Sequence, residues 1–185
     1  MNFLSHYKKD LINALNSIDS DKLDLIINSV LNVKINNNKV FLIGNGGSSA
    51  TPSHSAGDWS KELGIKALCL TDNTPILTAL ANDTDYSNVF KGQLEVFLDH
   101  GDIVIGYSGS GNSPNVINAL KYAKSKGNYA IGITGNYKNG GGGKLAKVAN
   151  LAIIFDTFSM EVIEDLHLVV NHIIKESIKL RLQEN

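Results

Sequence analysis

The sequence predicts a doubly wound α/β fold, in which a five-stranded, mainly parallel sheet is flanked by helices. Short apolar segments alternate along the chain with longer segments whose apolar residues recur at helical spacing. The short segments are apolar almost throughout, as strands are when helices cover both faces of a sheet. The length of 185 residues suits one domain with a substantial core, so we expect a single domain over residues 1–185.

Two helices are expected to precede the sheet, over residues 1–35. One series of apolar residues at helical spacing begins at Phe3, and a second begins at Leu23. Asp19 or Ser20 is a suitable N-cap between them, because its side-chain oxygen can accept a hydrogen bond from a free backbone N–H of the second helix.

An α/β core is expected over residues 39–155, and a long final helix over residues 158–181. The expected strands are residues 39–44, 66–71, 102–108, 129–134 and 151–155. The expected helices between them are residues 52–63, 74–82, 86–99 and 113–126, and residues 139–143 are expected to form a flexible loop. In such folds ligands bind beyond the carboxyl ends of the strands.

Composition argues against several classes of function. The net charge is −1 and no basic run occurs, so the electrostatic signature of a nucleic-acid partner is missing. No apolar run approaches the roughly 20 residues that a membrane span needs. The N-terminus lacks the apolar core of a signal peptide, and the single Cys69 cannot form an intrachain disulfide. We therefore expect a cytoplasmic protein.

A glycine-rich turn follows the first expected strand. Its candidate ligand-binding residues are consecutive in the sequence: Asn45, Gly46, Gly47 and Ser48. A strand that ends at glycines and leads into a helix presents unpaired N–H groups and the positive end of the helix dipole, which together favour an anion. The turn matches neither common nucleotide motif, since it lacks a following Lys-Ser/Thr and the third glycine at dinucleotide spacing. By itself it is equally consistent with a tight turn.

The third expected strand ends in a similar turn. Its candidate residues are Ser108, Gly109, Ser110 and Ser113, and Ser113-Pro114 forms a good helix start. Hydroxyls and backbone amides without a lysine or arginine suit one sugar phosphate better than a polyphosphate. Two such turns in one sheet favour a phosphate site over an ordinary surface loop.

These two turns resemble those of the sugar isomerase (SIS) domain family of phosphosugar-binding proteins. The whole chain is similar to the phosphoheptose isomerase branch, and Ala81-Asn82-Asp83 and Ile133-Thr134-Gly135 match that branch too. The resemblance implies an aldose–ketose isomerase that converts sedoheptulose 7-phosphate to D-glycero-D-manno-heptose 7-phosphate, for precursors of bacterial lipopolysaccharide or capsule. It also implies a homotetramer with zinc in the active site, and it suggests Asn82 and Asp83 as hydrogen-bond partners of substrate hydroxyls.

Moving a carbonyl between C1 and C2 needs an acid/base group and a group that stabilises the enediolate oxygen. His54 and Asp58 are four residues apart on one expected helix, so they face the same way and can share one metal ion. The resemblance implies that His54, Asp58, Glu164 and His172 hold a divalent metal. It also implies that Asp58 and His172 form the acid/base pair and that Glu164 contacts substrate.

Asp58 and Glu164 depart from the glutamate and glutamine of that branch. Eight residues of straight helix separate Glu164 from His172 by about 12 Å. One ion bound by both would need a bent helix or ligands from neighbouring subunits, so we expect sites at subunit interfaces. Trp59 and His167 are expected to have structural roles.

Two alternatives stay open. The chain could be a phosphosugar- or protein-binding SIS module without catalysis, or an isomerase of another phosphosugar in surface-polysaccharide synthesis. Two histidines and two carboxylates could take zinc, manganese or iron.

Overall fold

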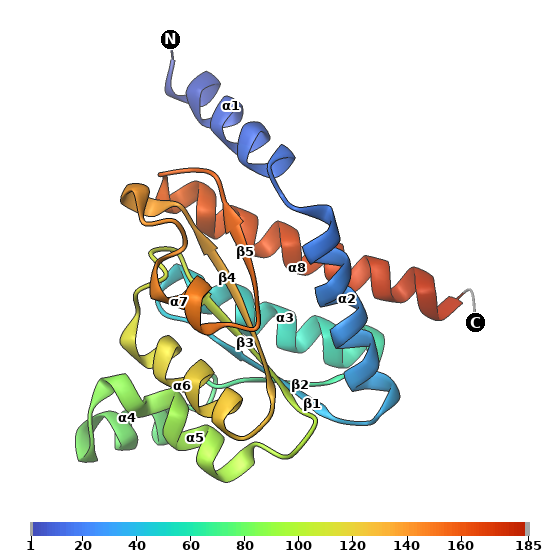
Figure 1. Cartoon of the computed structure of the whole chain (residues 1–185), viewed down its shortest axis with the longest axis vertical. Helices are drawn as coiled ribbons and strands as arrows, with labels where there is room; N and C mark the ends of the chain where they lie inside the picture. Colours follow the sequence, from blue (N-terminus) through green and yellow to red (C-terminus); the bar gives the residue numbers. More distant parts are fainter. Residues whose placement is uncertain (1, 184–185) are drawn as a thin grey trace.

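The computed structural model describes residues 2–183, and its centre is one sheet of five strands (Figure 1). Every neighbouring pair of strands is parallel, in the order β2-β1-β3-β4-β5. The predicted α/β fold class is therefore confirmed. The strands are β1 (Lys39–Ile43), β2 (Lys66–Cys69), β3 (Ile103–Ser108), β4 (Tyr129–Gly135) and β5 (Leu151–Phe155).

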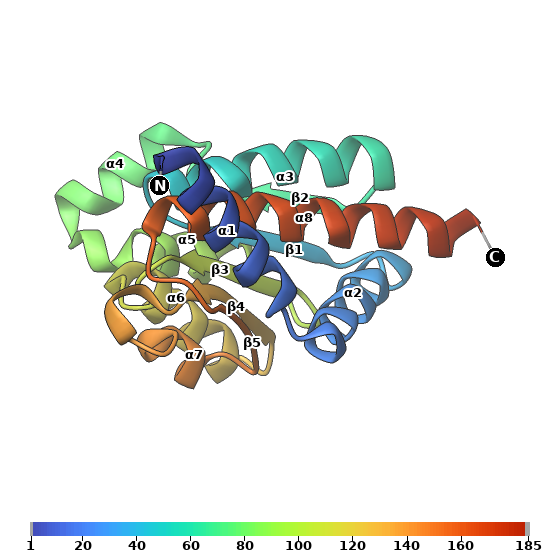
Figure 2. The same cartoon turned by 90° about the horizontal axis from the view of Figure 1, so that it is seen from above.

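Helices cover both faces of the sheet, which explains why the strands are mostly apolar. On one face α2 (Ser20–Ile35), α3 (Gly47–Leu63) and α8 (Met160–Gln183) bury their apolar side chains. On the other face α5 (Val89–Phe97), α6 (Pro114–Ser125) and α7 (Gly143–Val148) form a second core, with α4 (Thr74–Asp83) packed at its edge. Figure 2 shows α3 and α8 side by side on one side of the sheet, with α6 and α7 on the other.

The first helix, α1 (Phe3–Asn16), extends beyond the sheet and packs on α8 (Figure 1). The side chain of Asp19 accepts a hydrogen bond from Lys22 N at the start of α2, so one of the two predicted N-caps is correct. None of the helices in residues 2–183 combines the length and apolar character that crossing a bilayer requires.

The strand order places the two glycine- and serine-rich turns together. The chain leaves β1 toward β2 on one side and returns through β3 on the other, so the helices after β1 and β3 cover opposite faces. β1 and β3 are direct neighbours, with Ile43 paired to Gly106 near their carboxyl ends. A crevice at such a topological switch point is where doubly wound sheets bind ligands.

Two element predictions need correction, and one short helix was not predicted. α3 begins at Gly47 instead of residue 52, because the glycine turn itself winds into the helix. The helix predicted over residues 86–99 is a 3₁₀ turn, η1 (Tyr86–Asn88), followed by α5. Residues 140–142 form the loop expected there, between a second 3₁₀ turn, η2 (Tyr137–Asn139), and α7, a helix that the sequence did not predict because it has too few residues for a clear helical period.

Candidate active site

The turn after β1 brings backbone N–H groups to the start of α3. Gly46 has φ of +55°, a left-handed conformation that glycine adopts without steric cost. Gly44 must lack a side chain for another reason, because a Cβ there would lie 2.0 Å from the Ser48 carbonyl oxygen. The backbone can therefore turn sharply from β1 into the first turn of α3.

The Glu164 carboxylate lies at this helix start. A Cβ on Gly47 would be 2.2 Å from Glu164 Oε2, so this carboxylate lies against the first residue of α3. The half-buried Glu164 has a raised pKa, mainly because burial removes water from the carboxylate, and the nearby Glu161 adds to the effect. The anion that the glycine turn attracts within one chain is thus a side chain from α8.

The turn after β3 is held by its own side chains. Ser108 Oγ and Ser113 Oγ are 3.0 Å apart, and Ser110 Oγ accepts a hydrogen bond of 3.2 Å from Asn112 N. Gly111 has φ of +64°, and its carbonyl accepts a 2.8 Å hydrogen bond from Leu145 N at α7. The short α7, which the sequence did not reveal, therefore supports the second turn.

An asparagine pair joins the two turns. Asn45 and Asn115 exchange two side-chain amide hydrogen bonds, each 2.8 Å long, and Asn115 is 1% exposed. Tyr86 from η1 donates its hydroxyl to Asn45 Oδ1 at 3.0 Å. The Asn45 side chain is thus engaged in positioning the turns, which leaves its backbone as the group that a ligand would meet.

Asn82 and Asp83 lie in the last turn of α4, which extends one residue beyond the expected helix. Asn82 Nδ2 donates to Asp83 Oδ1 at 2.8 Å, and both side chains are exposed. Their proposed contact with substrate stays a prediction.

His54, Asp58 and His172 form one cluster between α3 and α8. Their candidate ligand atoms all lie within 4.8 Å of one another. His54 Nε2 is 3.1 Å from His172 Nε2 and 3.4 Å from Asp58 Oδ2. Glu164 is outside this cluster, as expected for residues two helical turns apart on a straight helix.

This donor set fits a divalent metal. Zinc with four ligands at about 2.0–2.1 Å places neighbouring ligand atoms about 3.3 Å apart, close to both distances in the cluster. Two imidazole nitrogens and one carboxylate oxygen are typical of catalytic zinc sites, which keep the fourth position for water or substrate. His54, Asp58 and His172 would hold the ion.

Comparison with known proteins identifies the family. A family model for the SIS domain matches residues 5–135. The chain belongs to the SIS domain family. A probable phosphoheptose isomerase from Thermoplasma volcanium is 40% identical over 184 residues, covering 92% of each chain. The phosphoheptose isomerase of Aneurinibacillus thermoaerophilus is 35% identical, with 93% of this chain and 90% of that protein covered.

The solved structures place this SIS domain in the same branch. Phosphoheptose isomerase GmhA from Neisseria gonorrhoeae superposes with a TM-score of 0.86 at 28% identity, covering 95% of this chain and 97% of its own. A phosphoheptose isomerase from Francisella tularensis has a TM-score of 0.87 at 22% identity, with coverage of 96% and 95%, and supports the fold.

In this chain a lysine also lies at the His54–Asp58–His172 cluster, and the sequence analysis did not predict it. Lys175 Nζ lies 3.1 Å from Asp58 Oδ2 and 3.2 Å from Glu62 Oε1. The ammonium is the main reason that the pKa of Asp58 is lowered, and the Asp58 hydrogen bond in turn raises the pKa of Lys175. Lys175 follows His172 by three residues and Glu62 follows Asp58 by four, so helical spacing was the available signal.

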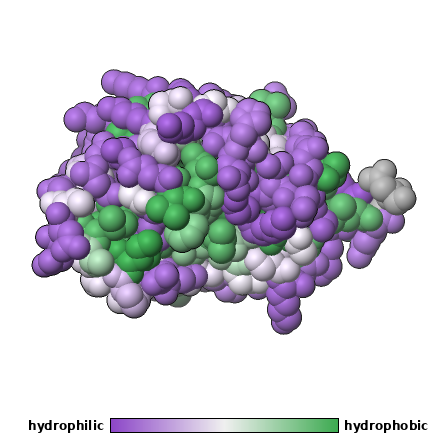
Figure 3. Space-filling view, turned by 90° about the horizontal axis from the view of Figure 1, so that it is seen from below, coloured by the Kyte–Doolittle hydropathy of each residue, from purple (hydrophilic) through white to green (hydrophobic). Residues whose placement is uncertain are grey.

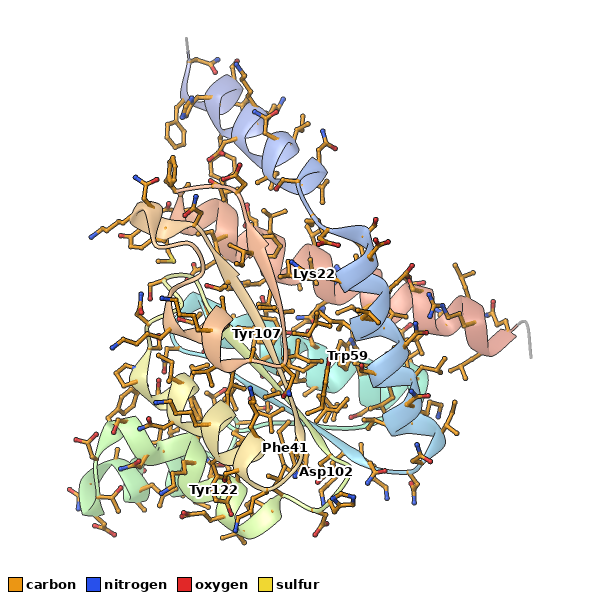
Figure 4. The ribbon with its side chains drawn as sticks, in the orientation of Figure 1. Lys22, Phe41, Trp59, Asp102, Tyr107 and Tyr122 are labelled. Carbon is orange, nitrogen blue, oxygen red and sulfur yellow. The ribbon has the colours of Figure 1, made fainter. Side chains whose placement is uncertain are left out.

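The predicted structural roles of Trp59 and His167 agree with their burial. Trp59 is 1% exposed in the core between the sheet and α3, and Figure 4 shows it with Tyr107 inside the molecule. The His167 ring is fully buried, 5.4 Å from the Tyr107 ring and 5.9 Å from the Phe155 ring.

Proposed function

We propose that this chain is a phosphoheptose isomerase that converts sedoheptulose 7-phosphate to D-glycero-D-manno-heptose 7-phosphate. The observation that carries this proposal is the His54–Asp58–His172 cluster on helices that also border the phosphate-type turn, in a chain 40% identical to a probable phosphoheptose isomerase. Its product would enter surface-polysaccharide precursors.

The phosphate would bind the turns after β1 and β3. Backbone N–H groups of Gly46 and Gly47 and the hydroxyls of the second turn would donate to it; those hydroxyls belong to Ser108, Ser110 and Ser113. Asn82, Asp83 and Glu164 are proposed to contact sugar hydroxyls.

Asp58 and His172 would move the proton between C1 and C2. The nitrogens of His54 and His172 and the Asp58 carboxylate all point into one small region, so a carbon held there is within reach of both a carboxylate and an imidazole. When bound, a divalent ion, which we propose is zinc, supplies a Lewis acid that polarises the carbonyl oxygen.

A homotetramer with sites at subunit interfaces completes the proposal. Apolar side chains are exposed on α1 and α5, namely Phe3, Leu4, Ile12, Val96 and Phe97. Figure 3 shows apolar surface between polar regions on one face of the molecule. A neighbouring subunit could also bring Glu164 to an ion that its own helix cannot reach.

The test is metal content together with isomerisation of sedoheptulose 7-phosphate, measured with and without a chelator. We expect about one ion per chain and turnover that the chelator removes. The His172→Ala variant should lose turnover and keep sugar-phosphate binding, because His172 belongs to the acid/base pair and not to the phosphate turns. Retained turnover in that variant would contradict the role of His172.

The Lys175–Asp58 ion pair favours a second candidate, a SIS module that binds phosphosugar without catalysis. An aspartate held by a lysine is less available to a metal or a proton. Sugar-phosphate binding without metal or turnover in the same assay would select this candidate.

The predicted cytoplasmic location stays a prediction.

A further inference from the structure

Lys175 shares one oxygen atom with the proposed metal site. Its Nζ lies 3.1 Å from Asp58 Oδ2, the same atom that is 3.4 Å from His54 Nε2. The Lys175 side chain is 11% exposed and that of Asp58 is 24% exposed, so water screens their charges less than at an open surface. An ion that binds Asp58 therefore meets a fixed positive charge.

The position of Lys175 is built by several contacts. On α3, Asp58 and Glu62 are one turn apart and both accept from Lys175 Nζ, at 3.1 and 3.2 Å. On α8, Glu176 Oε1 lies 3.3 Å from the same nitrogen. These three carboxylates hold the ammonium in the gap between α3 and α8, next to Asp58.

We propose that Lys175 is a positioning residue that competes with the divalent ion for Asp58 and so weakens metal affinity. This inference rests on the proposed function, because it requires that His54, Asp58 and His172 bind a metal. The ammonium acts as a tethered cation that already neutralises the carboxylate.

Two effects of Lys175 oppose each other. By holding Asp58 in one rotamer it reduces the entropy lost when a metal binds, which tightens binding slightly. By placing a positive charge a few ångströms from a divalent ion it repels that ion, and at such a distance, with little screening, charge repulsion is the larger effect. Removing the charge should therefore tighten metal binding.

The experiment is a zinc titration of the full chain against a competing chromophoric chelator. We expect Lys175→Met to bind zinc about tenfold or more tightly than the unmodified chain. Lys179→Met is the matched control, because Lys179 is one turn further along α8 and contacts Glu62 but not Asp58. Its dissociation constant should stay within about twofold.

A second variant tests the proposal independently in case Lys175→Met does not fold. Glu62→Gln removes one carboxylate that holds Lys175, which leaves the ammonium more fully on Asp58. Zinc binding should then weaken by about threefold or more, the direction opposite to that of Lys175→Met. Circular dichroism checks the fold of each variant.

The outcomes separate this inference from the proposed function. Tighter zinc binding in Lys175→Met, or weaker binding in Glu62→Gln if Lys175→Met does not fold, supports the competition. Zinc binding by the unmodified chain with an equal or weaker affinity in Lys175→Met overturns the competition and leaves the metal site intact. Zinc binding by neither protein overturns the proposed metal site and this inference together.

Discussion

His167 lies buried between the rings of Tyr107 and Phe155, where a charged imidazolium would lose its water. Burial lowers the pKa of His167 to about 3, against a smaller opposing contribution from the Ile133 backbone. The unfolded chain, with an ordinary histidine pKa near 6.5, binds more protons than the folded chain between those values. The contribution of His167 to stability is therefore present above about pH 6.5 and is lost progressively as the pH falls toward 3.

The variant His167→Phe should flatten this pH dependence. It keeps a ring in the core and removes the titrating group, so the difference in unfolding free energy between the unmodified chain and the variant should change by up to about 1.4 kcal/mol per pH unit below pH 6.5. Urea unfolding at several pH values measures it. If the unfolding free energies of the two proteins changed with pH in parallel, the lowered pKa of His167 would be contradicted.

At the scale of elements, two glycines, one before α3 and one within it, have opposite effects on stability. A Cβ at Gly44, just before the helix, would lie 2.0 Å from the Ser48 carbonyl oxygen. A Cβ at Gly57, within the helix, would meet no described atom within 4 Å, and that residue is exposed. The first glycine is required by close backbone approach, and the second costs helix stability for no packing reason.

We expect Gly44→Ala and Gly57→Ala to shift stability in opposite directions. Gly57→Ala should raise the unfolding free energy by roughly 0.5–1 kcal/mol, because alanine loses less backbone entropy in a helix. Gly44→Ala should lower it by about 2 kcal/mol or more and weaken sugar-phosphate binding, since the turn after β1 must move. Thermal unfolding and a binding titration test both, and a neutral Gly44→Ala would contradict the close contact.

At the scale of the whole molecule, α1 extends beyond the sheet and packs mainly on one other helix, α8. It packs on α8, where Tyr7 donates to Asp165 at 2.6 Å, yet Leu4, Ile12 and Leu15, which lie toward one side of α1, are 58%, 56% and 39% exposed. The carboxylate of Asp165 is the main reason that the pKa of Tyr7 is raised to about 12. An exposed apolar side of a helix that projects from the body suits contact between subunits.

The proposed tetramer predicts a particle of about 80 kDa from a 20.0 kDa chain. Ile12→Asp should reduce this mass, because it places a charge in an apolar interface, and Ile12→Leu should preserve it. Light scattering after gel filtration measures both. A monomeric unmodified chain, or an Ile12→Asp variant of unchanged mass, would contradict a tetramer interface on this side of α1.

The sequence by itself determined the fold class and the two glycine-rich turns at the ends of β1 and β3. Strand-to-helix alternation and glycines at the ends of β1 and β3 are local patterns, so they predict parallel strands and a ligand crevice without knowledge of packing. The pairing of His54 with Asp58 on one face also follows from helical spacing within one element.

Only the tertiary structure decided which residues on different elements meet. His172 reaches His54, Lys175 reaches Asp58, and Glu164 lies at Gly47, all because α3 and α8 pack in one particular register. Spacing along a helix determines which side chains share a face. How two helices cross depends on the packing of all the side chains between them. That combined packing cannot be worked out from the spacing of residues along one sequence.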